Sequence, residues 1–295
     1  MIFLKPIIML LSFLSMKSLY AISDVLYFFT YHVFTYRRAV VRKNMAMSFP
    51  HYSNLQIQSI EKKFYRHFCD LIVESIKAHR ISEEELKERV QLKNVELLEN
   101  LIVSGKSLAG VLGHMGNWEW AVLRMAQSVS FPVHALYQAS SSKRFDRWMK
   151  TNRSRFGAHL VATTEIKSLI RILEQRPIGI GFLADQTPVH VKKAHWTYFL
   201  KQTTPVYTGV EKMAMQHHLA VVYLTVTKPT RGHYHIAFDL ITDRPNQMAP
   251  GDITEIHTKM LEANIIQQPE IWLWTHRRWK RSHLKPNNVE IKARH

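Results

Sequence analysis

Residues 108–119 read Leu-Ala-Gly-Val-Leu-Gly-His-Met-Gly-Asn-Trp-Glu, and they contain a strand, a turn and the start of a helix. The run 108–113 is short, apolar and uncharged, as a buried strand would be. It stops at His114, between two glycines that permit a tight turn. Asn117 is a good N-cap for a helix that begins at Trp118. The pattern therefore predicts His114 at the carboxyl end of a strand, where open α/β sheets usually bind ligands.

Apolar periodicity on both sides of this unit predicts alternating helices and strands. Helical patterns cover 54–80, 91–104, 117–129, 143–156, 164–176, 208–218 and 252–267. Strand-like runs cover 108–113, 132–137, 159–162, 178–184, 220–227 and 233–241. A short turn at 228–232 joins the last two strands and suits an antiparallel pair. We therefore expect an α/β fold with a mixed central sheet flanked by helices.

The first forty residues are apolar and aromatic, but Lys17 and Asp24 interrupt them. Neither half clearly reaches the roughly 18 charge-free residues that a spanning helix needs. The basic residues Arg37, Arg38, Arg42 and Lys43 follow, and cations there suit anionic headgroups on the cytoplasmic face. We expect 1–36 to be a membrane anchor or an interfacial helix and 37–295 the folded domain. A hydrophobic core helix is the alternative for 1–36.

The chain has 295 residues and a formal net charge of +17 at pH 7. Such a basic balance is typical of proteins that bind nucleic acid or an anionic membrane surface. No nucleic-acid-binding motif is recognisable, and the apolar amino terminus favours the membrane. The single cysteine, Cys69, excludes an internal disulfide. The chain also lacks the Cys/His clusters of zinc sites, so we expect neither a metal nor a cofactor.

His114 and Glu119 lie five positions apart, so only the turn between them could bring them together. Acyl transfer from a thioester to a hydroxyl needs a base for the hydroxyl proton, and imidazole has a suitable pKa. A nearby carboxylate would fix the tautomer of the imidazole, and a helix amino terminus would favour the developing oxyanion. The spacing alone is a weak motif. In a chain with 17 histidines, a purely structural histidine is its alternative.

Three further blocks stand out: 152–157 (Asn-Arg-Ser-Arg-Phe-Gly), 182–186 (Phe-Leu-Ala-Asp-Gln) and 269–279 (Pro-Glu-Ile-Trp-Leu-Trp-Thr-His-Arg-Arg-Trp). Together with 113–119, and in this order, they resemble the late-acting lauroyl/myristoyl acyltransferases of lipid A biosynthesis. Related bacterial lysophospholipid-type acyltransferases are also similar. Residues 42–50 resemble the family's approach to its catalytic region, so the likeness spans nearly the whole chain.

The resemblance implies an acyltransferase-like fold and catalysis by His114 with Glu119. Asp185, at a second strand end, would be another carboxylate facing His114, and which of the two orients the imidazole stays open. Arg153 matches the family's arginine and would bind a phosphate or the oxyanion, with Arg155 as the neighbouring alternative. The acyl donor would be a thioester of acyl carrier protein or coenzyme A. The acceptor would be a glycolipid or phospholipid at the bacterial inner membrane, with the catalytic domain on the cytoplasmic face.

Asn117 and Gln186 are further candidates for contacts with substrate. The Asp-Gln pair departs from the commonest lipid A enzymes, so a lysophospholipid or an aminolipid is an alternative acceptor. A membrane hydrolase is a rival function, but the chain lacks a Gly-x-Ser-x-Gly elbow. A basic protein that binds nucleic acid or membranes without catalysis is another. The basic residues around Arg278 could form a solvated face or hold headgroups, whereas the nearby tryptophans favour core positions.

Overall fold

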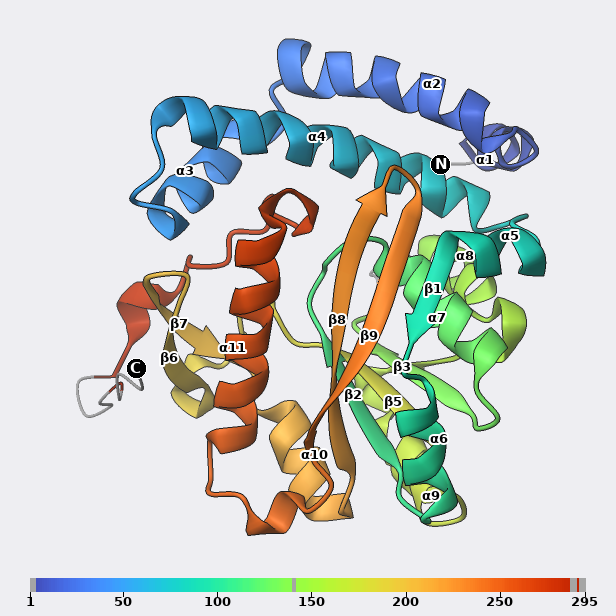
Figure 1. Cartoon of the computed structure of the whole chain (residues 1–295), viewed down its shortest axis with the longest axis vertical. Coiled ribbons are helices and arrows are strands. Elements are labelled where there is room, and N and C mark those ends of the chain that lie inside the picture. Colours follow the sequence, from blue (N-terminus) through green and yellow to red (C-terminus); the bar gives the residue numbers. More distant parts are fainter. Residues whose placement is uncertain (1–3, 140–141, 287–290, 292–295) are drawn as a thin grey trace.

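The computed structural model describes residues 4–139, 142–286 and 291, and its centre is a seven-stranded sheet. The strand order is β1-β9-β8-β2-β5-β3-β4, and all neighbours are parallel except β8 and β9 (Figure 1). The strands are β1 (Val90–Lys93), β2 (Leu108–Leu112), β3 (Val133–Tyr137), β4 (His159–Ala162), β5 (Gly179–Leu183), β8 (Ala220–Thr230) and β9 (His233–Thr242). The predicted mixed α/β sheet is confirmed, with β2 at its centre.

Helices cover both faces of this sheet (Figure 1). They are α5 (Glu83–Arg89), α6 (Glu96–Val103), α7 (Trp118–Ser128), α8 (Lys143–Arg153), α9 (Ile166–Leu173), α10 (Gly209–His217) and α11 (Asp252–Gln267). The side chains of β2 alternate between the faces: Leu108 and Leu112 lie under α6 and α7, and Val111 lies under α11. Burial on both faces explains the uninterrupted apolar sequence of β2.

The amino-terminal helices lie across the end of the sheet at which β2, β3, β4, β5 and β8 finish (Figure 1). They are α1 (Leu4–Ser12), α2 (Met16–Tyr27), a π-helical segment (Phe28–Val33), α3 (Arg38–Ser48) and α4 (Asn54–Lys77). Helix α2 packs on α4, and Leu19 of α2 is fully buried. In the part of the chain that the structure describes, no helix is long and apolar enough to cross a bilayer. Helices α1 and α2 pack on α4, and many large apolar side chains between residues 7 and 34 remain exposed.

The basic cluster after this segment makes contacts within the protein. The guanidinium groups of Arg38 and Arg42 donate to the two carboxylate oxygens of buried Glu61, at 2.6 and 2.8 Å. Arg37 donates to the carbonyl oxygen of Thr275 at 3.1 Å. These cations therefore hold α3 against α4 and against residues 269–279, which we call the carboxy-terminal block.

Two parts of the fold differ from the expectation. The predicted helix 91–104 is divided: its first residues belong to strand β1, and only Glu96–Val103 is helical. An unpredicted antiparallel hairpin follows β5, formed by β6 (His195–Phe199) and β7 (Gln202–Val206). Both differences lie outside the strand–turn–helix unit, which folds as expected.

Candidate active site

The turn after β2 is shaped by close packing around its two glycines. A Cβ on Gly113 would come within 2.6 Å of Leu261, and Gly116 has a left-handed φ of +54°. The carboxy-terminal block forms backbone hydrogen bonds with the same turn. Gly116 N donates to Ile271 O at 2.9 Å, and Leu273 N donates to His114 O at 3.2 Å. His114 is thus held at the end of β2 by residues far away in sequence.

Asp185 contacts the imidazole of His114. It follows β5, and because β5 pairs in parallel with β2, the two residues meet at the same edge of the sheet. His114 Nδ1 lies 2.6 Å from Oδ1 of Asp185, and the backbone N of His114 donates to Oδ2 at 2.9 Å. Trp272 Nε1 also donates to Oδ2, at 2.8 Å. Asp185 is therefore a buried carboxylate with three donors around it.

The ionisation of Asp185 decides which nitrogen of His114 can act as a base. Burial alone would raise the pKa of Asp185, but the neighbouring His114 and the hydrogen bonds to the carboxylate hold this pKa well below its usual range. An ionised carboxylate only accepts hydrogen bonds, so Nδ1 of His114 carries the proton. In the neutral imidazole, Nε2 then holds the lone pair. Gln186 Nε2 lies 3.3 Å from it.

The second carboxylate, Glu119, has a different partner. Both of its oxygens accept from the guanidinium group of Arg153, which reaches across from α8. Trp118 Nε1 donates to Glu119 at 3.2 Å, and the Trp118 ring packs edge-on against His114 with centroids 5.0 Å apart. Within the described residues, no hydrogen bond joins Glu119 to His114. Of the two carboxylates left open by the sequence, Asp185 is the one that orients the imidazole in this structure.

A comparison with known families shows the kind of protein to which this chain belongs. The model of the bacterial lipid A biosynthesis acyltransferase family matches residues 2–281, nearly the whole chain. The chain belongs to this family. No curated protein is similar enough in sequence to be named as a relative. The chain is therefore an acyltransferase of the lipid A type, and the matched range includes His114, Arg153 and Asp185.

Asn117 and Arg155, two residues that the sequence suggests for substrate contacts, form hydrogen bonds within the protein in this lipid A acyltransferase family member. Asn117 is buried, and its side-chain oxygen caps α7 by accepting from Trp120 N at 2.9 Å. Its amide nitrogen donates to Glu74 at 2.8 Å. Arg155 donates to the carbonyl oxygens of Ala78 and Ile81, at 2.5 and 2.8 Å, and closes the end of α4. These contacts give both residues structural tasks, because their polar groups are already engaged by the protein.

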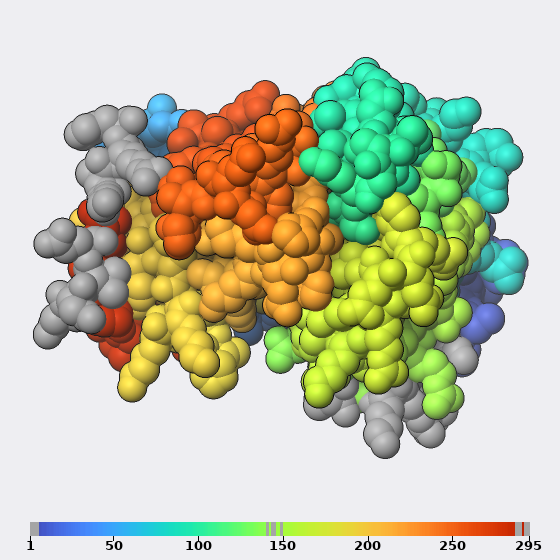
Figure 2. All heavy atoms as spheres, turned by 90° about the horizontal axis from the view of Figure 1, so that it is seen from below, coloured from blue at the N-terminus to red at the C-terminus, as the bar shows by residue number. Residues whose placement is uncertain are grey.

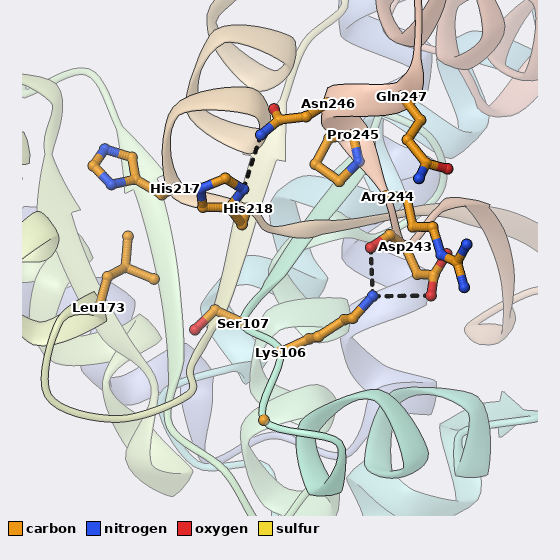
Figure 3. Close-up of a pocket in the computed structure, with 11 residues that line it drawn as sticks. Lys106, Ser107, Leu173, His217, His218, Asp243, Arg244, Pro245, Asn246 and Gln247 are labelled. Carbon is orange, nitrogen blue, oxygen red and sulfur yellow. Dashed lines mark hydrogen bonds and ion pairs between the residues drawn. The ribbon is translucent and has the colours of Figure 1, made fainter.

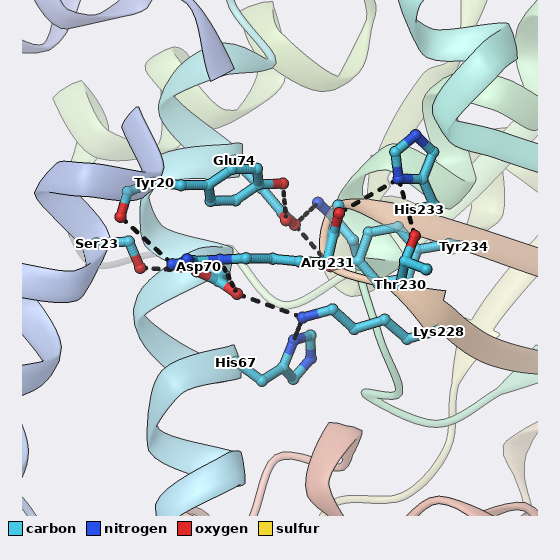
Figure 4. A network of polar contacts seen from close by, with 12 residues as sticks. Tyr20, Ser23, His67, Asp70, Glu74, Lys228, Thr230, Arg231, His233 and Tyr234 are labelled. Carbon is cyan, nitrogen blue, oxygen red and sulfur yellow. Dashed lines mark hydrogen bonds and ion pairs between the residues drawn. The ribbon is translucent and has the colours of Figure 1, made fainter. Parts of the chain in front are cut away.

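Glu74 on α4 supports the turn after β2, and sequence reasoning missed it (Figure 4). Its buried carboxylate accepts from Tyr20 of α2, from Asn117 and from Tyr234 of β9, each at 2.8 Å. Asp70, one turn earlier, accepts from Arg231 and Lys228 of the β8–β9 hairpin. Burial raises the pKa of Glu74. Two acidic residues spaced by four on an apolar helix face were the available signal for such a network.

The carboxy-terminal block is built into the core. Trp272 and Trp274 are buried, as expected of core anchors. The expected solvated or headgroup-binding face is wrong for Arg278, which is only 2% exposed and donates to the carbonyl oxygen of Pro205 at 2.8 Å. Burial lowers the pKa of His276 to about 4, and its Nε2 accepts from Thr187 N at 3.2 Å. The block thus positions Asp185 and the turn.

The opposite end of the sheet contains a separate hollow of about 470 Å³. Figure 2 views the molecule from that end, where α6, α9 and α10 meet. Lys106 lies in the hollow and pairs with Asp243, with its Nζ 2.9 Å from Oδ2 (Figure 3). The hollow shares no residue with the His114–Asp185 dyad. In the described parts of the chain, no three His, Cys, Asp or Glu residues are placed to hold a metal ion.

Proposed function

We propose that this chain transfers a fatty acyl group from a thioester to a hydroxyl of a lipid A precursor, with Nε2 of His114 as the base. The donor would be acyl carrier protein or coenzyme A. The observation that carries the proposal is the 2.6 Å contact between Asp185 and Nδ1 of His114, which in the neutral imidazole puts the lone pair on Nε2. The strongly basic chain also suits an acidic donor, since its net charge is +17.

In the proposed reaction, the acceptor hydroxyl donates a hydrogen bond to Nε2 of His114. The hydroxyl oxygen attacks the thioester carbonyl while Nε2 takes its proton. Asp185 stabilises the imidazolium that forms. The amino-terminal turn of α7 favours the negative charge on the carbonyl oxygen. The carbon–sulfur bond then breaks, and the imidazolium returns the proton to the departing thiolate.

Arg153 and Glu119 are assigned to substrate binding in this proposal. The Arg153 side chain is 16% exposed, and Glu119 holds its guanidinium from one side. A guanidinium that is oriented in this way can bind a phosphate through two parallel hydrogen bonds. Lipid A precursors and both thioester donors carry phosphates, so the pair would position the substrate while His114 acts on it.

An apolar cavity beside the site is the candidate location for the end of the acyl chain. It has a volume of about 70 Å³ and lies under α7, along β2 and β5. Gly110 and Gly181 are register partners on these strands and leave its floor open. A Cβ on Gly181 would meet only a backbone oxygen, that of His134, within 4 Å. The space runs along the strand that ends at His114.

The amino-terminal helices are proposed to lie on the cytoplasmic face of the bacterial inner membrane. Large apolar side chains there are exposed: Ile7, Met9, Leu10, Phe13, Val25, Phe28, Phe29, Val33 and Phe34. Such a surface favours contact with the lipid interface. It lies at the end of the sheet that carries His114, so a membrane-bound acceptor would be close to the base (Figure 1).

Mass spectrometry of membrane lipids tests the proposal. A strain that lacks this chain should lose one acyl chain from a lipid A species, and expression of the chain should restore it. Loss of an acyl chain from a phospholipid or an aminolipid instead would replace the proposed acceptor. An unchanged lipid profile, together with no transfer by the purified chain, would contradict the proposed reaction.

A further inference from the structure

A small internal cavity lies behind the His114–Asp185 dyad, on the face of the sheet covered by α11. Asp185 lines it, together with Tyr223 of β8, His257 of α11 and Arg278 of the carboxy-terminal block. The space inside it that the centre of a water molecule can reach is about 10 Å³. This is close to the minimum that one water molecule needs.

Three residues that line this cavity each have a buried polar atom with no hydrogen-bond partner among the described residues. These atoms are Oη of Tyr223, Nε2 of His257 and Nε of Arg278. Their residues are 1%, 3% and 2% exposed, so bulk solvent does not reach them. Buried groups left in this way cost free energy, and native proteins satisfy nearly all of them. Three such residues from three elements around one cavity indicate a shared partner.

Asp185 also has an unused position for a hydrogen bond. A carboxylate offers about four acceptor positions. His114 Nδ1, the backbone N of His114 and Trp272 Nε1 occupy three of them. The fourth is free in the described structure, and the carboxylate lines the cavity.

We propose that this cavity binds one water molecule, which joins Tyr223, His257 and Arg278 to Asp185. The water accepts from Arg278 Nε and from the Tyr223 hydroxyl. It donates to Nε2 of His257 and to the free position on Asp185. Burial lowers the pKa of His257 to about 4, so its imidazole is neutral near pH 7 and can accept. Two accepted and two donated bonds satisfy the water and all three orphan atoms.

Charge and size argue against other occupants. An anion would face the carboxylate of Asp185, and a cation would face the guanidinium of Arg278. The space is also too small for an organic molecule. A small neutral molecule that both donates and accepts fits these limits. The water would add a fourth hydrogen bond to Asp185 and connect it to Arg278, and its binding does not depend on whether His114 is the base.

The sign of a change in melting temperature tests this site. Tyr223→Phe removes the hydroxyl and little else. If the hydroxyl bonds to a bound water, the variant loses a buried hydrogen bond, and Tm should fall by roughly 1–3 °C. If the hydroxyl has no partner, its removal relieves a desolvation penalty. A Tm that is unchanged or higher would therefore overturn the proposal.

Tyr234→Phe is the matched control, because Tyr234 is equally buried and its hydroxyl donates to Glu74 at 2.8 Å. Its Tm should fall whatever the cavity holds, which shows that the measurement detects one lost hydrogen bond. A crystal structure of the full chain provides the direct test. We expect a water peak at roughly 2.7–3.2 Å from Arg278 Nε and Tyr223 Oη. An empty cavity, or a heavier peak from a halide ion, would refute the water.

Discussion

Asp185 is the residue on which the geometry of the site depends. Its Oδ1 contacts Nδ1 of the His114 imidazole, and its Oδ2 accepts a hydrogen bond from the backbone N of the same residue. Its role could be predicted only as one of two choices, because the pairing of β2 with β5 brings residues 71 positions apart into contact. Glu119 is nearer in sequence, but the start of α7 turns it towards Arg153.

Asp185→Asn should leave the fold intact and reduce kcat by roughly 10³-fold or more, because an amide cannot stabilise the imidazolium. Glu119→Gln should mainly raise KM, with kcat changed by less than about tenfold, since Glu119 contacts Arg153 rather than His114. Steady-state kinetics on both purified variants separates the roles. Equal losses of kcat in the two variants would show that Glu119 acts with His114 and Asp185 in the chemical step.

Arg278 shows why single charged residues resist prediction. It lies among other cations at 277–281, a composition typical of a solvated surface. The structure buries it beneath Phe199 with a guanidinium–ring distance of 5.8 Å. No local period in the sequence distinguishes it from its exposed neighbour Arg277, because its burial follows from how the carboxy-terminal block folds back onto the β6–β7 hairpin.

Among the helices and strands, a strong apolar periodicity in the sequence predicts the bounds of an element well. Helix α11 and strand β4 have the predicted bounds. Strand β1 was missed because a left-handed turn at Asn94 separates it from α6, and the Asn94 side chain bonds to both backbone groups of Phe238. The β6–β7 hairpin was missed because Leu200 and Lys201 form its turn with positive φ, where Asn and Gly are usual.

Gly181→Val tests whether the cavity under α7 holds the acyl chain. The added side chain would enter the cavity, because a Cβ at this position has room. The ratio of kcat/KM for the longest accepted donor to that for a donor two carbons shorter should fall roughly 10-fold or more. Gly209→Ala is the control, since Gly209 has open space around it and lies outside the cavity. An unchanged donor preference in Gly181→Val would place the chain elsewhere.

At the scale of the whole molecule, the apolar surface of α1 and α2 should attach the protein to lipid. Leu10 is 72% exposed and Phe13 is 62% exposed. Changing both to Glu should weaken binding to anionic vesicles by roughly 100-fold or more, since each buried side chain contributes about 1.5–3 kcal/mol. Co-sedimentation measures this. Val103→Glu alters an exposed apolar residue on α6 and should bind as the wild type does. Full binding by the double variant would rule out this surface.

Buried neutral histidines predict how stability depends on pH. Burial lowers the pKa values of His134, His257 and His276 to about 4. Their unfolded value is about 6.5. The unfolded chain therefore binds more protons between these values, and stability falls as the pH drops from about 6.5 to about 4. Melting scans should show Tm decreasing through this range. A constant Tm down to pH 4.5 would mean that these histidines are protonated in the folded protein.

The role of His114 as the base is tested most directly by measuring acyl transfer by purified His114→Ala, with the wild-type chain in parallel. The thioester donor is added to vesicles that carry the lipid A precursor, and the product is measured by mass spectrometry. We expect transfer by the wild type and a loss of roughly 10³-fold or more in the variant, with vesicle binding retained. Transfer by His114→Ala at the wild-type rate would contradict the assignment of His114 as the base.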